Sequence, residues 1–168
     1  MGITILQTII TILMIKIFIT LIILCGCSRE AKMGIGEFSD RINKDYGTVL
    51  EESSMLLEKN EESNTVYCKI DSFLFVFYLG SNNNISAVSA MLPKESESEL
   101  TEFLDDFAKC VSVFTLNSKD IVEQTFTDCK ITADNIKFTD GNQLNTVGKF
   151  KYSVITNEFS VTLFCERV

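Results

Sequence analysis

The sequence has 168 residues, of which 46% are hydrophobic and 23% charged, a composition that suits one globular domain with a short appendage. It contains no histidine, which excludes histidine-based catalysis, and its single proline, Pro93, excludes a proline-rich linker. Only Lys16 among the basic residues precedes Cys27, so the rest of the chain has 14 basic and 23 acidic residues, a formal charge of −9. Nucleic acids are bound through Lys and Arg, so we predict no nucleic-acid partner for so acidic a domain.

The first 24 residues are strongly apolar and have two interpretations. Residues 3–24 form a run of 22 mostly apolar residues with one charge, Lys16, which is long enough to cross a bilayer as a single helix. In the second interpretation Lys16 is the basic start of a signal peptide, and residues 17–24 are its apolar core. Met14 is then an alternative start of the protein. Eight apolar residues are too few to span a membrane but suit a signal peptide.

The end of this apolar run resembles the lipobox of bacterial lipoproteins. Leu24, Cys25 and Gly26 precede Cys27, as a leucine, a small residue and a glycine precede the lipidated cysteine in that family. The resemblance implies that a signal peptide of residues 1–26 is cleaved between Gly26 and Cys27, and that Cys27 receives a diacylglyceryl thioether. Cys25 departs from the family, where Ala, Ser or Thr is commoner, but it is still a small residue.

A lipid on Cys27 would determine where the protein lies. One acyl chain attaches a protein only marginally, whereas the two chains of a diacylglyceryl group give a stable anchor. We therefore expect a protein that is lipid-anchored at the extracytoplasmic face of the cell membrane, with residues 27–36 as the attachment point and tether. The alternative is an uncleaved single-span membrane protein, in which Arg29 and Lys32 would favour a cytoplasmic domain.

Residues 37–168 are predicted to form a single globular α+β domain, whose first half begins with a helix at 37–47 that ends at Gly47. Four strands are expected after this helix, at 54–59, 65–70, 73–80 and 85–92. Within 73–80, Phe73, Phe75 and Phe77 alternate with Leu74, Val76 and Tyr78. Because both sides of this strand are apolar, it is either a central strand covered on both sides, or one face contacts helices and the other forms an interface.

The second half begins with the longest predicted helix, which follows Pro93. Ser96 and Glu99 form a capping-box pattern there. The apolar face of the helix consists of Leu100, Phe103, Leu104, Phe107, Val111 and Phe114. A short helix at 119–126, an ambiguous segment at 130–146 and a hairpin of strands 147–156 and 159–168 follow. This order predicts an antiparallel β-sheet of about five strands, with one main helix and one or two short helices packed on it.

The cysteines beyond Cys27 are Cys68, Cys110, Cys129 and Cys165. They show no close pair of metal-ligand spacing, and without histidine they predict no metal site. We interpret them as small buried hydrophobic residues. A disulfide is the alternative, since the protein is expected outside the cytoplasm.

Four acidic residues, Glu95, Glu99, Glu102 and Asp106, line one side of the main helix. They are interpreted as its solvated face, although calcium binding or acid–base catalysis would also need such residues. No catalytic residue, metal or cofactor is predicted. The sequence favours a lipid-anchored, non-enzymatic domain that binds a protein or a small molecule at the cell surface. The alternative is an exported enzyme with two acids brought together and at least one shifted pKa.

Overall fold

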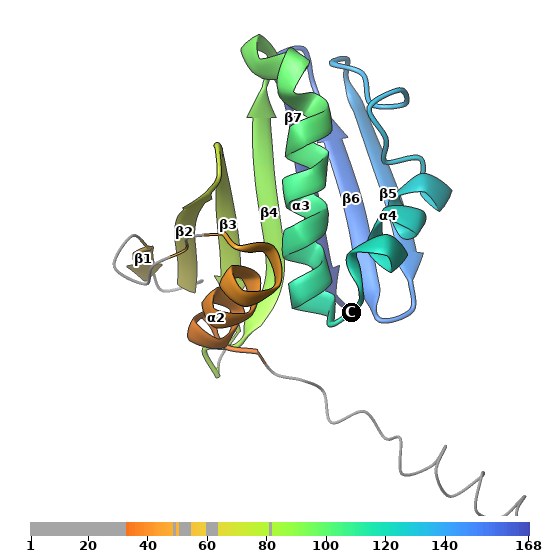
Figure 1. Cartoon of the computed structure of the whole chain (residues 1–168). Coiled ribbons are helices and arrows are strands. Elements are labelled where there is room, and N and C mark those ends of the chain that lie inside the picture. Colours follow the sequence, from red (N-terminus) through yellow and green to blue (C-terminus); the bar gives the residue numbers. More distant parts are fainter. Residues whose placement is uncertain (1–32, 49, 51–54, 60–63, 81) are drawn as a thin grey trace, which may run out of the picture. The chain divides into compact units, whose positions relative to one another are not determined.

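The computed structural model describes residues 33–168 except 49, 51–54, 60–63 and 81 (Figure 1). The predicted signal peptide, its cleavage site at Gly26 and the lipid attachment at Cys27 lie outside the described residues. Among the described helices, none is long and apolar enough to cross a membrane.

The described residues form two layers, a seven-stranded antiparallel sheet and a layer of helices on one of its faces (Figure 1). The elements are α2 (Ile35–Tyr46), β1 (Leu56–Lys59), β2 (Asn64–Ile70), β3 (Phe73–Leu79), β4 (Ile85–Pro93), the 3₁₀-helix η2 (Lys94–Glu99), α3 (Leu100–Thr115), α4 (Lys119–Asp128), β5 (Gly141–Val147), β6 (Phe150–Thr156) and β7 (Ser160–Arg167). The strands lie side by side in the order β1-β2-β3-β4-β7-β6-β5. The α+β class and the antiparallel sheet are confirmed.

The sheet has seven strands where about five were predicted, and the edge strand β5 explains much of the difference. Its sequence, GNQLNTV, is mostly polar, because an edge strand has few side chains to bury and shows no clear alternation. Gly148, with a φ of 61°, makes a two-residue turn that joins Val147 to Phe150. The predicted strand 147–156 was therefore wrong at its start, which contains the end of β5 and this turn.

The folded unit begins earlier than predicted. Met33 is buried, and its carbonyl accepts a hydrogen bond of 2.8 Å from the N–H of Ile85 at the start of β4. Helix α2 begins at Ile35 and ends, as predicted, at Gly47, whose φ of 67° is the left-handed conformation that glycine favours. Residues 33–36, which were expected to be the end of the tether, therefore belong to the folded unit.

The predicted capping box before α3 is wrong. Ser96 lies inside η2 with a non-helical backbone, and neither η2 nor α3 has a side-chain hydrogen bond to its N-cap. The reason is a tertiary contact. The N–H of Lys94 donates to the carbonyl of Phe159 in the β6–β7 turn at 2.8 Å, so the chain is held against that turn before α3 begins.

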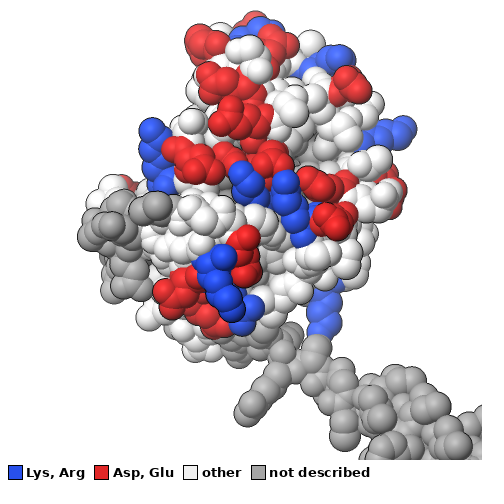
Figure 2. Space-filling model, in the orientation of Figure 1, with Lys and Arg blue, Asp and Glu red and all other residues white. Residues whose placement is uncertain are grey.

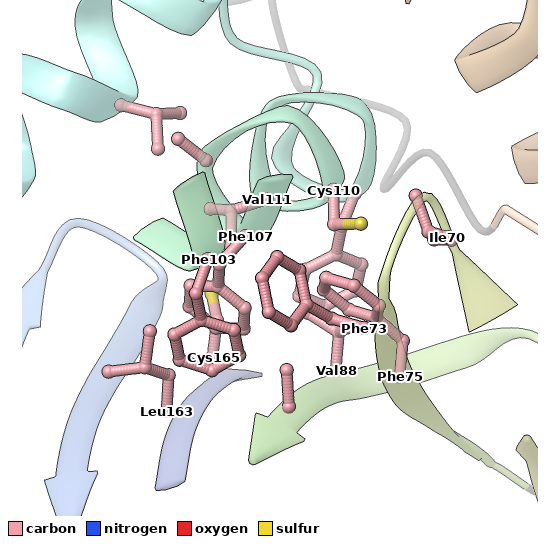
Figure 3. Close-up of a cluster of buried hydrophobic side chains, with 14 of the residues drawn as sticks. Ile70, Phe73, Phe75, Val88, Phe103, Phe107, Cys110, Val111, Leu163 and Cys165 are labelled. Atoms are coloured by element: carbon pink, nitrogen blue, oxygen red, sulfur yellow. The ribbon is translucent and has the colours of Figure 1, made fainter. Parts of the chain in front are cut away.

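The core lies between α3 and the sheet (Figure 3). The predicted apolar stripe of α3 is buried at all its positions except the partly buried Leu104. Phe107 is central, since its ring centroid lies 6.4 Å from that of Phe75 on β3 and 5.9 Å from that of Phe126 on α4. Phe73, Phe75 and Phe77 are buried under the helices, so this side of β3 forms part of the core.

The four cysteines are all buried and free. Burial raises the pKa of Cys68 to about 12, and burial also raises the pKa values of Cys110 and Cys165 above their ordinary values. Thiols of this kind are largely protonated at neutral pH and are therefore poor nucleophiles. Their interpretation as small buried hydrophobic residues is confirmed.

Candidate functional site

Two hollows lie on the helix side, and every basic group that lines them is already paired with an acid. A hollow of about 370 Å³ lies between α2 and the α3–α4 connection, and Arg41 and Lys119 contribute to its wall. Arg41 is paired with Glu37, and Lys119 with Glu123 and Asp105. A hollow of about 290 Å³ lies between α3 and α4. Neither hollow brings together the free acid and base that catalysis would need.

An ion cluster occupies the middle of the helix side, where Figure 2 shows lysines among acidic side chains. The Nζ atom of Lys109 lies 2.7 Å from Oδ1 of Asp106, 3.0 Å from Oδ2 of Asp105 and 3.8 Å from Oδ2 of Asp71. Asp106 is only 1% exposed, and its Oδ2 atom has no hydrogen-bond partner in the described part of the chain. Lys109 therefore compensates the charge of a buried carboxylate.

The two adjacent aspartates of this cluster have opposite pKa shifts. Burial raises the pKa of Asp106 and outweighs its hydrogen bond with Lys109. Burial also acts to raise the pKa of Asp105, but hydrogen bonds from Lys119 and Lys109 outweigh it and hold that pKa below its ordinary value. Such a pair is what the enzyme hypothesis required. However, Asp106 lines none of the described hollows, so nothing in this geometry gives a substrate access to it.

Asp106 also corrects the prediction that the acidic side of the main helix is solvated. Glu95, Glu99 and Glu102 are exposed as predicted, whereas Asp106 is buried. Asp106 follows the buried Phe103 by three residues and precedes the buried Cys110 by four. Residues at these spacings share one face of a helix, so the burial of Asp106 could have been predicted from the sequence. These four acids form no common site, and no group of described residues could hold a metal ion.

The opposite face of the sheet has no helix over it among the described elements, and we call it the outer sheet face. It consists of the side chains that point away from the helices, which belong to every second residue of each strand. Strand pairing places seven of them in one row across the whole sheet, namely Leu56, Tyr67, Val76, Ser89, Phe164, Ser153 and Leu144. This row contains no charged residue.

The outer sheet face is unusually rich in exposed apolar side chains. Five of the ten large hydrophobic residues found exposed lie on it, one on each of five strands, and each is 47% to 60% exposed: Leu56, Leu74, Met91, Leu144 and Ile155. Tyr78 and Phe164 lie between them with their rings in an edge contact at 5.5 Å. Large exposed apolar patches on soluble domains usually mark interaction sites.

The outer sheet face is also electrically neutral. Its described strands contribute two acidic and two basic residues, Glu58, Glu166, Lys69 and Lys151. Lys151 and Glu166 neutralise each other in an ion pair of 2.5 Å. Since the chain beyond Cys27 carries −9, the excess acid lies elsewhere, including the helix side seen in Figure 2. The outer sheet face can therefore approach another neutral surface without electrostatic repulsion.

The shape of this face indicates what kind of partner it suits. Seven strands at their normal spacing of about 4.8 Å make a surface roughly 30 Å wide, and three rows of side chains extend it by roughly 20 Å along the strands. Small ligands are normally bound in concave pockets, whereas a broad and shallow surface suits a protein.

No family model matches this sequence, and no significant match was found among the curated proteins or the solved structures. Inferences about function therefore depend on the lipobox resemblance and on the geometry of the domain. Of the residues singled out in the sequence, Gly26 and Cys27 lie outside the described residues. The sequence predicted the outer sheet face only in part, because an interface on the second face of the strand at 73–80 was one of two explanations for its apolar side chains.

Proposed function

We propose that this chain is a lipoprotein, anchored through Cys27 at the extracytoplasmic face of the cell membrane, whose domain binds a protein partner through the outer sheet face without catalysing a reaction. The observation that carries the proposal is the neutral, apolar surface on the side of the sheet that no described helix covers. The lipobox at Leu24–Cys27 supports the anchor.

A partner on this face would bring a substantial gain in free energy. Complete burial of a Leu, Ile or Met side chain contributes about 1.5–3 kcal/mol, so covering the exposed half of each contributes roughly 1 kcal/mol. The five exposed apolar residues of the outer sheet face would together contribute roughly 5 kcal/mol before the cost of association. This burial would offset only the lower end of the cost of association, about 4–15 kcal/mol, so contacts over the rest of the face would have to supply the net affinity.

The anchor predicts that Cys27→Ala abolishes both lipidation and cleavage of the signal peptide. Bacteria that express the full chain are grown with a labelled fatty acid, and label in the protein is measured after extraction. The wild type is expected to be labelled and to stay with the membrane, whereas the variant takes up no label. Cys25→Ala is the matched control and should behave as the wild type, since alanine is common at that lipobox position. Label in the Cys27→Ala protein would refute the assignment.

The binding surface is tested by photocrosslinking in the same cells. A photoreactive amino acid at Val76, in the middle of the outer sheet face, is expected to give a crosslinked product with a discrete partner. The double substitution Leu74→Lys with Met91→Lys should reduce that product at least tenfold, because two buried charges would replace apolar contacts. Ile121→Lys, at an exposed apolar position on α4, is the control and should leave the product unchanged. Equal products from all three proteins would contradict the proposal.

A further inference from the structure

We infer that the protein bound by the outer sheet face is a second copy of this chain, so that two anchored domains pack sheet against sheet as a symmetric pair. This inference rests on the proposed function and names the partner of the same surface. Most soluble homo-oligomers are closed pairs with a twofold axis, in which both copies bury the same patch. The outer sheet face therefore has to be complementary to itself in charge, in extent and in shape.

The charge of the outer sheet face suits a partner that has the same charge as this chain. The chain beyond Cys27 has a formal charge of −9, so two copies repel each other unless their contact surfaces are free of excess acid. The strands that form the outer sheet face contribute two acidic and two basic residues to it, and Lys151 and Glu166 are already paired with each other. A basic partner would suit an acidic surface instead. The neutral face is therefore a surface on which two acidic chains can meet.

The extent of the face is sufficient for a pair of copies. A surface of roughly 30 Å by 20 Å buries roughly 600 Å² on each copy and roughly 1,200 Å² in total, which is the lower bound of stable protein interfaces. Both copies would contribute the same set of exposed apolar side chains, so the pair removes twice as many of them from water as one face alone. Attachment to one membrane also raises the effective concentration of each copy for the other.

A twofold axis along β4 makes the two faces complementary in shape. β4 is the middle strand of the seven, and Ser89 is the middle residue of the row across the face (Figure 1). Because β3 and β7 flank β4, this axis places Phe164 of one copy opposite Val76 of the other. Packed sheets are rotated by about 30°, which leaves residues beside the axis opposite each other. A large side chain thus faces a smaller one, whereas an axis across the strands would set Phe164 against Phe164.

The lipid anchors favour the same axis. Two anchors in one bilayer require the twofold axis to stand perpendicular to the membrane. An axis across the strands would turn an edge of the sheet to the bilayer and raise Met33, which is hydrogen-bonded at the start of β4, by roughly half the sheet width, about 15 Å. Met33 follows Cys27 by six residues, which reach at most about 20 Å. The axis along β4 instead brings the start of both folded units to the bilayer and leaves the tethers unstretched.

Thiol crosslinking can test this arrangement, because the described cysteines are all buried and the wild type therefore gives the background. Met91→Cys places a thiol on the axis, where only the roughly 10 Å between packed sheets separates it from its counterpart. Leu56→Cys is the matched control, since both positions are about equally exposed on the outer sheet face, at 54% and 60%. With the axis along β4, the two copies of Leu56 lie roughly 30 Å apart, whereas an axis across the strands would set them opposite each other.

Two versions of each lipidated full-length protein, with different epitope tags, are coexpressed in bacteria, and isolated membranes are treated with a short thiol crosslinker. We expect a product that contains both tags from Met91→Cys, in at least about tenfold excess over Leu56→Cys, because the crosslinker cannot span roughly 30 Å. Leu74→Lys in the Met91→Cys protein should reduce this product about tenfold, since it buries a charge beside the axis. Ile121→Lys, on α4, should leave the product unchanged.

The possible results separate this inference from the proposed function. A product of Met91→Cys that contains one tag and another protein would overturn the second copy as the partner and leave the proposed function intact. Equal products from Met91→Cys and Leu56→Cys, or no product from either, would overturn the arrangement. Photocrosslinking at Val76 that captures no protein at all would refute the proposed function, and this inference with it.

Discussion

Lys109→Met is expected to lower the free energy of unfolding by about 3 kcal/mol at neutral pH. The substitution leaves a methionine of similar length but removes the cation that lies 2.7 Å from the buried carboxylate of Asp106. Asp106 would then be buried without a compensating charge, which costs far more than the loss of an exposed ion pair. Urea unfolding of the wild type and the variant measures the difference.

The cost of this substitution should depend on pH. The raised pKa of Asp106 means that the folded state binds its proton more readily than the unfolded state, so this group stabilises the fold in acid and loses that effect as the pH rises. Removing Lys109 raises the pKa of Asp106 further. The deficit should therefore be largest at neutral pH and shrink in acid, where Asp106 is protonated and needs no cation.

Lys119→Met is the matched control for Lys109→Met. Lys119 pairs with Asp105, whose side chain is 39% exposed, so water replaces the lost partner and the cost should stay below about 1 kcal/mol. If the two variants lose equal stability, or if the deficit of Lys109→Met does not change with pH, the ion cluster does not serve to neutralise Asp106.

Phe107→Ala is expected to lower the free energy of unfolding by about 4 kcal/mol. The ring is buried between those of Phe75 and Phe126, so it joins α3 to both the sheet and α4. Truncation loses the transfer free energy of the ring and leaves a cavity among side chains that are held by three separate elements. Thermal and urea unfolding should both show the loss.

Two controls separate packing from the mere removal of an aromatic ring. Phe107→Leu refills most of the cavity and should cost less than about 1.5 kcal/mol. Phe159→Ala removes a ring that is 71% exposed, and the change should stay within about 0.5 kcal/mol. A cost for Phe159→Ala as large as that for Phe107→Ala would show that the core is not centred where α3 packs on β3.

Elements with a strong apolar period could be predicted from the sequence, and those held by tertiary contacts could not. The alternation in β3 and the stripe of α3 each specify one buried face, and both are found where they were expected. Strand β5 has little to bury, and its place at the sheet edge depends on pairing with β6. The capping pattern at Ser96 forms no cap, because a hydrogen bond from the N–H of Lys94 to the carbonyl of Phe159 fixes the chain before α3 begins.

Only part of the candidate binding surface could be predicted from the sequence. The apolar side chains of Leu74, Val76 and Tyr78 indicated that the second face of β3 must be covered or serve as an interface. The sequence could not show that Leu56 and Leu144, from strands at opposite edges, share one row with Val76. That row depends on the order β4-β7-β6-β5, which brings the end of the chain beside its middle.

The most direct test of the anchored state is the intact mass of the wild-type protein extracted from bacterial membranes. We expect a chain that begins at Cys27, with the mass of residues 27–168 plus a diacylglyceryl group and, where the new amino group is acylated, one further acyl chain. A full-length chain without modification would contradict the lipoprotein assignment and favour a single membrane-spanning helix.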